Sequence, residues 1–288
     1  MVLGAVISLG CLVLAGGRAP AQSYSAYSDP EKPAIAFILS QKGNAEEFQS
    51  EFALDDEEMN RILAAVQKEN QTIARAYAES EAQKMSASDY NERVREAIAE
   101  TKSVIERLLP EDQIPHLKEW VDAKFARASQ EAAESAAADV QVSASGSRSV
   151  RCKVYASYYY AYTRYEVALP HQRLKFREHH RKVRLRPVAN GHGAKAPVKE
   201  VGPWNKRDNY WQSRKDRDMW DNLPRCMPEA EAAYFHNYHR GRDDQGRIVR
   251  NPAGIDLTLA VAKRMEIKNR IKRQGVVRVS VRYPWVKR

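Results

Sequence analysis

The hydrophobic pattern of this chain changes period near residue 150, and this change limits the folds that the sequence can adopt. Before it, apolar residues recur at intervals of three and four, as on one face of an amphipathic helix. After it, short apolar segments alternate with polar or basic residues, as in half-buried strands. Residues 128–149, between the two patterns, are rich in Ala, Ser, Glu and Gln, a composition typical of a linker. We therefore expect an α+β protein in which a helical unit precedes a β unit.

The two halves also carry opposite charge. Residues 1–140 contain 14 Lys and Arg against 24 Asp and Glu, a net charge of −10. Residues 141–288 contain 33 Lys and Arg against 13 Asp and Glu, a net charge of +20. A unit this basic is expected to attract a polyanion. On charge alone the polyanion is a nucleic acid, an anionic lipid surface or an acidic polymer of a cell wall.

The N-terminus has the pattern of a secretory signal peptide. Residues 2–15 form an apolar run of the length of a signal-peptide core, which is too short to span a bilayer comfortably. Ala19-Pro20-Ala21 offers a small-x-small cleavage site, although no basic residue precedes the run. We expect residues 1–21 to be a signal peptide and the mature protein to be secreted, without stable membrane insertion. A buried N-terminal helix is the alternative.

Only two cysteines, Cys152 and Cys226, would remain in the mature chain. In an oxidising compartment they can pair, but two cysteines do not define a disulfide framework. The sequence leaves their pairing open.

Residues 35–127 are predicted to form an acidic bundle of three or four helices, after an extended lead-in over residues 22–34. Asp55 and Glu58 have the spacing of a capping box at a helix start. Apolar residues with helical spacing follow in three helices and are expected to form the core: Met59, Ile62, Leu63 and Val66; Val94, Ile98, Ile105 and Leu108; Ile114, Leu117, Val121 and Phe125.

Residues 150–288 are predicted to form a small β-barrel with one late helix, Leu259–Ile271. One strand ends in the stretch 251–262, where Asp256 lies between Ile255 and Leu257. An isolated carboxylate in this place either caps the following helix or is positioned for proton transfer. Burial at an apolar strand end would raise its pKa, which suits a general acid. The other short strands are expected within residues 150–160, 165–169, 182–188, 197–201 and 276–283.

Four motifs in the basic half occur in the order typical of one known family. They are Ala156-Ser-Tyr-Tyr159, the His-containing segment Ala168–Phe176, Glu200-Val-Gly-Pro-Trp204 and Gly254-Ile-Asp-Leu-Thr258. In this order they resemble the double-psi β-barrel of the rare lipoprotein A family, which is related to expansins and barwin. The resemblance covers residues 150–286 and implies a six-stranded double-psi barrel. The segment from Trp204 to Arg250 is longer than the usual connection in the family, and we expect it to be a helical, aromatic-rich insertion.

The resemblance also implies an activity, because bacterial members of the family act on peptidoglycan and several are lytic transglycosylases. It places the catalytic acid on Asp256, the active-site histidine on His171, and a second carboxylate, or the partner of an arginine, on Glu200. We predict that the substrate is bound by Trp204, Trp211, Tyr158 and Arg207, since aromatic faces stack on sugar rings and a guanidinium can meet the anionic groups of wall polymers.

Other chemistries have weaker support in the sequence. His236 and His239 are spaced for metal binding, but no Cys or acid completes a zinc set, so we expect no metal and no cofactor. Basic residues among aromatics also describe single-strand nucleic-acid binding, which a secretory start disfavours. We therefore predict a secreted, wall-associated enzyme that cleaves glycan with Asp256 as acid and base. A non-catalytic, expansin-like wall-binding module is the alternative, and the oligomeric state is left open.

Overall fold

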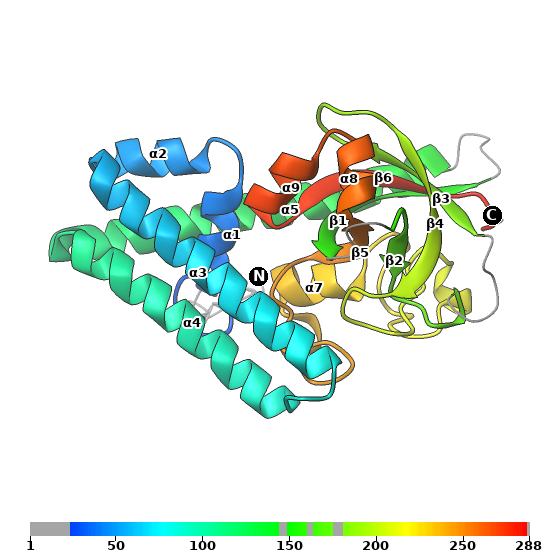
Figure 1. The fold of residues 1–288 in the computed structure, drawn as a ribbon, viewed down its shortest axis with the longest axis horizontal. Helices are drawn as coiled ribbons and strands as arrows, with labels where there is room; N and C mark the ends of the chain where they lie inside the picture. Colours follow the sequence, from blue (N-terminus) through cyan, green and yellow to red (C-terminus); the bar gives the residue numbers. More distant parts are fainter. Residues whose placement is uncertain (1–23, 144–148, 160–163, 175–180, 287–288) are drawn as a thin grey trace, which may run out of the picture.

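The computed structural model describes residues 24–143, 149–159, 164–174 and 181–286. Helices α1 to α5 form the N-terminal half, and a closed six-stranded β-barrel lies in the C-terminal half (Figure 1). The α+β prediction, with helices first and a barrel second, is confirmed. The predicted signal peptide, residues 1–21, lies outside the described residues.

Helix α3 begins at the capping box that the sequence predicted. The side chain of Asp55 accepts a hydrogen bond from the backbone N–H of Glu58 at 2.8 Å, and the Glu58 carboxylate accepts one from the N–H of Asp55 at 3.0 Å. This capping box confirms the predicted helix start.

Leu63, expected in the core, is 37% exposed. The helices of this half are α1 (Ala34–Ser40), α2 (Asn44–Glu51), α3 (Asp56–Glu81), α4 (Ala87–Leu108) and α5 (Ile114–Ser143).

Helix α5 continues to Ser143, so most of the segment expected to be a linker, residues 128–149, is helical. Ala is the strongest helix former, and Glu and Gln rank close behind it. The composition that suggested a linker therefore also suits a helix, and tertiary packing decides between the two. Within this segment Ala132 is buried, 1% exposed, in the core of the protein.

The barrel closes in the order β1-β5-β2-β4-β3-β6. Strands β1 and β5 pair in parallel, as do β2 and β4, and the other neighbouring strands are antiparallel. Inward and outward residues alternate cleanly along β3 and β6, as the sequence pattern predicted. The strands are β1 (Val150–Tyr159), β2 (Val167–Leu169), β3 (Lys182–Pro187), β4 (Ala194–Val201), β5 (Ala253–Thr258) and β6 (Val277–Tyr283).

A helix begins directly after β5, as predicted, but it is shorter than expected. Thr258 caps it, because its side-chain oxygen accepts a hydrogen bond from the N–H of Val261 at 3.4 Å. The predicted helix breaks at Glu266, whose φ of 60° is left-handed. The result is two short helices, α8 (Leu259–Arg264) and α9 (Lys268–Gln274).

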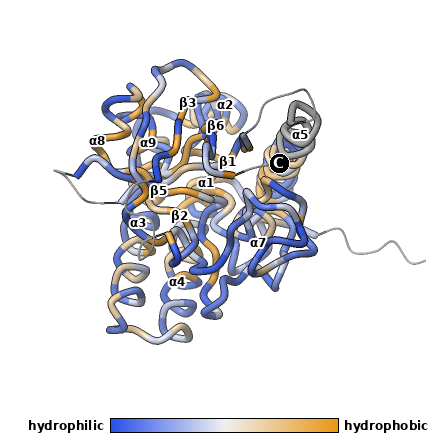
Figure 2. The backbone as a smooth tube through the Cα atoms, turned by 90° about the vertical axis from the view of Figure 1, so that its right-hand side faces the viewer, coloured by the Kyte–Doolittle hydropathy of each residue, from blue (hydrophilic) through white to orange (hydrophobic). Residues whose placement is uncertain are grey.

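The segment between β4 and β5, residues 202–252, contains α7 (Glu229–His236) and the 3₁₀ turns η2 (Arg214–Asp216) and η3 (Tyr238–Gly241). In Figure 2 the tube around α7 is mostly hydrophilic, whereas the strands nearby are mostly hydrophobic. Buried ion pairs stabilise this polar segment. Arg217 contacts Asp208 at 2.6 Å with both side chains 1% exposed, and Arg247 contacts Asp243 at 2.6 Å with both fully buried.

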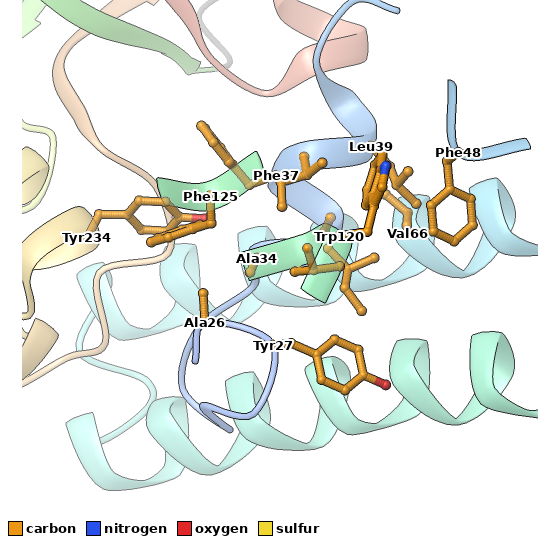
Figure 3. Packing of buried hydrophobic residues seen from close by; sticks show 14 of the residues in the cluster. Ala26, Tyr27, Ala34, Phe37, Leu39, Phe48, Val66, Trp120, Phe125 and Tyr234 are labelled. Atoms are coloured by element: carbon orange, nitrogen blue, oxygen red, sulfur yellow. The ribbon is translucent and has the colours of Figure 1, made fainter. Parts of the chain in front are cut away.

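One hydrophobic core joins the helices to the barrel (Figure 3). Phe37 of α1 lies at its centre, with its ring 6.2 Å from Tyr155 of β1 and 5.3 Å from Tyr234 of α7. Phe125 of α5 packs against two of these rings, 6.4 Å from Phe37 and 5.6 Å from Tyr234. The two halves predicted as separate units therefore share apolar side chains, and a second core fills the inside of the barrel.

The lead-in before α1 takes part in this junction. Tyr27 and Lys32 are buried, at 7% and 4% exposed. The Lys32 ammonium donates hydrogen bonds to the backbone carbonyls of Tyr234 at 2.7 Å and Ala233 at 3.4 Å. Burial lowers the pKa of Lys32 to about 8. The described part of the predicted extended lead-in thus packs between the helices and α7.

Cys152 of β1 and Cys226 of the segment before α7 form a disulfide, with 74 residues of sequence separation. This bond answers the pairing question that the sequence left open. It ties the long segment between β4 and β5 to the first strand of the barrel. Both cysteines are buried, at 0% and 1% exposed.

Replacing both cysteines with Ala is expected to lower the free energy of unfolding by about 2–4 kcal/mol, because a cross-link restricts the unfolded chain. Denaturant unfolding of the Cys152→Ala, Cys226→Ala protein measures this loss. Wild-type protein treated with reductant is the matched control and should lose a similar amount. Equal midpoints for the oxidised wild type and the double variant would contradict the expectation.

Candidate functional site

Asp256 lies in a row of four residues that crosses neighbouring strands of the barrel. In β5 it is the direct partner of Ser157 in β1 and of Ala168 in β2, and Ala168 in turn is the partner of Glu200 in β4. Partners in register point to the same face of a sheet. Ile255 and Leu257, on either side of Asp256, are fully buried in the barrel core, so this face is the outer one. The fold therefore places both predicted carboxylates on one outer surface.

Small residues separate the two carboxylates. Ala168 stands between them in the row, and Gly202 lies directly above it. A methyl group added to Gly202 would lie 3.6 Å from Oδ2 of Asp256 and 4.0 Å from the β-carbon of Ala168. Gly202, with φ 140°, also begins the cis peptide bond to Pro203. The floor between Asp256 and Glu200 thus has no bulky side chain, and Asp256 remains partly exposed to solvent.

The environment of Asp256 favours its protonated form. Burial raises its pKa from 3.8 to about 6, and Glu81 raises it further, while the hydrogen bond from Ser157 and the charge of Arg250 lower it. The Ser157 hydroxyl donates that bond to Oδ1 of Asp256. The raised pKa anticipated from the apolar strand end is therefore present. A carboxyl group of this kind can give up a proton at mildly acidic pH and take it back.

Tyr159 belongs to the same outer face, two residues beyond Ser157. Its hydroxyl donates a hydrogen bond to Oε1 of Glu166 at 3.2 Å. Burial raises the pKa of Tyr159, and the negative charges of Glu166, Asp256 and Glu200 raise it further. The neutral phenol is thus the stable form beside three carboxyl groups.

The end of helix α3 reaches this site from the helical half. The Tyr77 hydroxyl accepts a hydrogen bond from the backbone N–H of Trp204 at 3.2 Å, and the two rings lie 4.8 Å apart. Arg250 lies over both rings, with its guanidinium carbon 5.7 Å from the centre of Tyr77 and 5.9 Å from that of Trp204. Since Glu81 and Arg250 both act on Asp256, the helical half helps to set the protonation of the barrel carboxylate.

His171 lies in a different place from Asp256. Its Nε2 contacts Oδ2 of Asp218 at 3.1 Å, and both residues line a cavity of about 320 Å³ together with Trp211. Burial lowers the pKa of His171, whereas Asp218 raises it. Arg207 is exposed and pairs its backbone with that of His171 in an isolated bridge. The structure brings His171 and Arg207 together, and it pairs His171 with Asp218, a residue to which the sequence gave no role.

The three predicted sugar-stacking side chains are used for packing. Trp204 is 3% exposed in the core shared with the helices, and Trp211 is 2% exposed and stacks on Tyr283 at 5.0 Å. Tyr158 is partly buried against the barrel core. Trp204 fills space in the apolar core and offers no free face to a sugar ring. Trp211 is nearly as buried, although it lines the cavity beside His171.

Several residues at the site received no role from the sequence. Ser157 and Gly202 lie inside the motifs that pointed to the barrel, so the motifs themselves held a signal for them. Tyr77 and Glu81 had no such signal, because they belong to a helix about 175 residues away in the chain whose pattern predicts only packing.

Neither a metal centre nor a membrane-spanning helix emerges from the described residues. In the ranges that the structure covers, no three His, Cys, Asp or Glu side chains gather in a way that could hold an ion. Across those same ranges, no helix combines the length and apolar character needed to cross a bilayer.

The comparison with known families gives the limits of one domain but assigns it no function. The sequence model of a domain of unknown function, DUF8814, matches residues 150–280, which run from the start of β1 into β6. No curated protein matches the chain, and no solved structure matches it either. The family match thus begins at the residue where the sequence pattern changes from helical to β, and it covers the face that carries Asp256.

Proposed function

We propose that the barrel cleaves a glycosidic bond of a cell-wall glycan such as peptidoglycan, with Asp256 as the single general acid and base. The observation that carries this proposal is the position of Asp256. It is a partly exposed carboxyl group with a pKa of about 6, and it lies on the outer face of the barrel over a floor of Ala168 and Gly202. A capping role is excluded by Thr258, which caps the following helix itself.

The chemistry proposed is that of a lytic transglycosylase. The protonated Asp256 donates its proton to the glycosidic oxygen while the bond from that oxygen to the sugar carbon breaks. The C6 hydroxyl of the same sugar then forms a new bond to that carbon, and its proton passes to the Asp256 carboxylate. The product is an anhydro sugar, Asp256 is again protonated, and no water is consumed.

Glu200 supports this reaction by its charge. The transition state of glycoside cleavage carries positive charge on the sugar ring. Glu200 lies two strands from Asp256 on the same face, with only Ala168 between them in the row. A negative charge two strands away on this face would stabilise the positive ring.

The finer fold and the location are part of the same proposal. We place the barrel in the double-psi class, supported by the two parallel pairs β1–β5 and β2–β4 in a closed barrel of six strands. We infer secretion to the cell wall from the signal-like N-terminus, and the disulfide between Cys152 and Cys226 suits an oxidising compartment.

The test is a digest of purified peptidoglycan by the mature protein, with the soluble products read by mass spectrometry. Anhydro-sugar ends from the wild type, and none from Asp256→Asn, are the expected result. Products with ordinary reducing ends would point to a hydrolase, and no product from either protein would refute the enzymatic proposal.

A non-catalytic wall-binding module is the second candidate. The burial of Trp204 and Trp211 counts against it, because both were expected to bind sugar rings. It is favoured by the basic outer surface of the barrel. Pelleting of the protein with insoluble wall, unchanged in Asp256→Asn and without soluble products, would support it.

A further inference from the structure

Four basic residues lie side by side on the barrel, on a face other than that of Asp256. Arg151 of β1 is the direct partner of Arg282 in β6, Arg282 is the partner of Arg184 in β3, and Arg184 is the partner of Lys195 in β4. We call these four residues the basic row. At a strand spacing of about 4.8 Å the row spans roughly 14 Å.

The basic row faces solvent, and no acid among the described residues pairs with it. Arg151, Arg184 and Lys195 are exposed, and Arg282 is partly buried with its Nε donating a hydrogen bond to the Ser149 hydroxyl at 2.5 Å. In the part of the chain that the structure describes, none of the four forms an ion pair.

Arg278, on the same strand as Arg282, is an arginine of this barrel whose contacts stabilise the fold. Its guanidinium contacts Glu231 at 3.3 Å and lies over the ring of Tyr155 at 4.5 Å. Among the described residues, the basic row makes no ion pair or aromatic contact of this kind. Arg151, Arg184 and Lys195 therefore contribute little to folding, and their charge is available to a binding partner.

The charge continues along β3. Lys182 and Arg186 point outward on either side of Arg184, and both are exposed. The pairing partner of Lys182 is Pro197 and that of Arg186 is Ser280, so no acid stands opposite either one. The basic row and these two residues form one surface of six cationic side chains.

Such an arrangement lowers the stability of the free protein. Like charges directly opposite each other on neighbouring strands repel, by a few tenths of a kcal/mol up to about 1 kcal/mol for a pair. A bound polyanion removes the repulsion and releases its own counterions, so binding gains from the same charges.

We propose that the basic row binds a linear acidic polysaccharide and holds the barrel on it. The proposal concerns a surface separate from the Asp256 site. A single-stranded nucleic acid fits the surface less well, because single strands are held by exposed aromatic platforms as well as by charge. The exposed aromatic side chains of the described residues are Tyr24 and Tyr165, and neither lies on β1, β3, β4 or β6.

Two strands connect the basic row to the Asp256 site. Strand β1 carries Arg151 near its start and Ser157 near its end, and β4 carries Lys195 near its start and Glu200 near its end. The basic row thus lies at the opposite end of these strands from the candidate active site. A polymer held by the row leaves the Asp256 face open to a second glycan segment.

The experiment compares the binding of labelled polygalacturonate, a linear polycarboxylate glycan, by wild type and by Arg184→Gln, Lys195→Gln over a range of salt concentration. The variant should bind about tenfold or more weakly at low salt, and the slope of log K against log salt should fall by about 1.5, since two cationic contacts are lost. Its melting temperature should equal or exceed that of the wild type. A second pair, Arg151→Gln with Lys182→Gln, tests the same surface if the first pair does not fold.

A matched control removes the same charge elsewhere. Arg75→Gln, Lys118→Gln changes two exposed residues of α3 and α5 and should bind polygalacturonate as the wild type does. Equal weakening by the control would overturn the proposal, because net charge alone would then explain binding. Tighter binding of single-stranded DNA than of polygalacturonate would overturn it in favour of a nucleic acid. Asp256→Asn should bind as the wild type does, which separates this surface from the proposed catalysis.

Discussion

Replacing Asp256 with Asn is expected to lower the rate of glycan cleavage by about 10²- to 10⁴-fold, the usual contribution of a general acid. Asn keeps the shape of the side chain but cannot donate the proton that the leaving oxygen needs. The rate of the wild type should also fall as pH rises through about 6, because Asp256 then loses that proton. Initial rates of soluble-product release from peptidoglycan between pH 4 and 8 measure both effects.

Stability provides the control for this variant. The pKa of Asp256 is about 6 in the folded protein, whereas the ordinary value of 3.8 applies to the unfolded chain. The stability that the raised pKa contributes is therefore fully present below pH 4 and is lost as pH rises through 6. Asn does not titrate, and Asp256→Asn should therefore melt no lower than the wild type at pH 8. A variant that melts much lower would show that the lost activity reflects unfolding.

Ser157 offers a sharper test of how the site is tuned. Its hydrogen bond to Asp256 lowers the pKa of that carboxyl group. Ser157→Ala should shift the fall in rate to higher pH while keeping most of the activity at pH 5. An unchanged pH profile would show that Ser157 does not position the proton of Asp256.

Replacing Arg247 with Met is expected to lower the free energy of unfolding by about 3–5 kcal/mol, the usual effect of breaking a buried ion pair. Arg247 is fully buried, contacts Asp243 at 2.6 Å and also pairs with Glu81 of α3. Its guanidinium carbon lies 4.8 Å from the centre of the Tyr77 ring. The substitution leaves Asp243 buried without its counter-charge, and denaturant unfolding measures the loss.

Arg242→Met is the matched control, because Arg242 contacts Glu31 at 2.7 Å but both side chains are about one quarter exposed, at 26% and 28%. A pair that solvent reaches on this scale is screened and contributes less than a fully buried one, about 1 kcal/mol. The double variant Asp243→Asn, Arg247→Met should recover part of the loss, since no unpaired charge is then buried. A loss from Arg247→Met no larger than that from Arg242→Met would contradict the central role of Arg247.

Sequence patterns predicted the helices and strands well where their form depends only on residues close together in the chain. The capping box of Asp55 and Glu58 depends on residues three apart and is present, and the helix predicted directly after β5 begins where expected. The strands were found because inward and outward side chains alternate along them. Leu63 shows the limit of such reasoning, since helical spacing gives a face but the partners of a helix decide how wide the buried stripe is.

The candidate site was predictable only in part. Asp256 was singled out by its place between two apolar residues, which left capping and proton transfer open, and the family resemblance favoured the second role. Its raised pKa follows from burial at that strand end. The roles of Trp204 and Trp211 were not, because composition does not tell an aromatic that packs from one that faces solvent. Asp218, the partner of His171, received no role from the sequence, because it lies 47 residues further along the chain in the segment between β4 and β5.

The sequence by itself determined the division into an acidic helical half and a basic barrel, the helix caps and the strand faces, since each of these depends on residues close together in the chain. Only the tertiary structure decided that Phe37 joins the two halves in one core, that α3 brings Glu81 to Asp256, and that four cations stand in a row across β1, β6, β3 and β4. Those contacts join residues far apart in sequence, and the register of strand pairing and the packing of helices, which no local pattern encodes, bring them together.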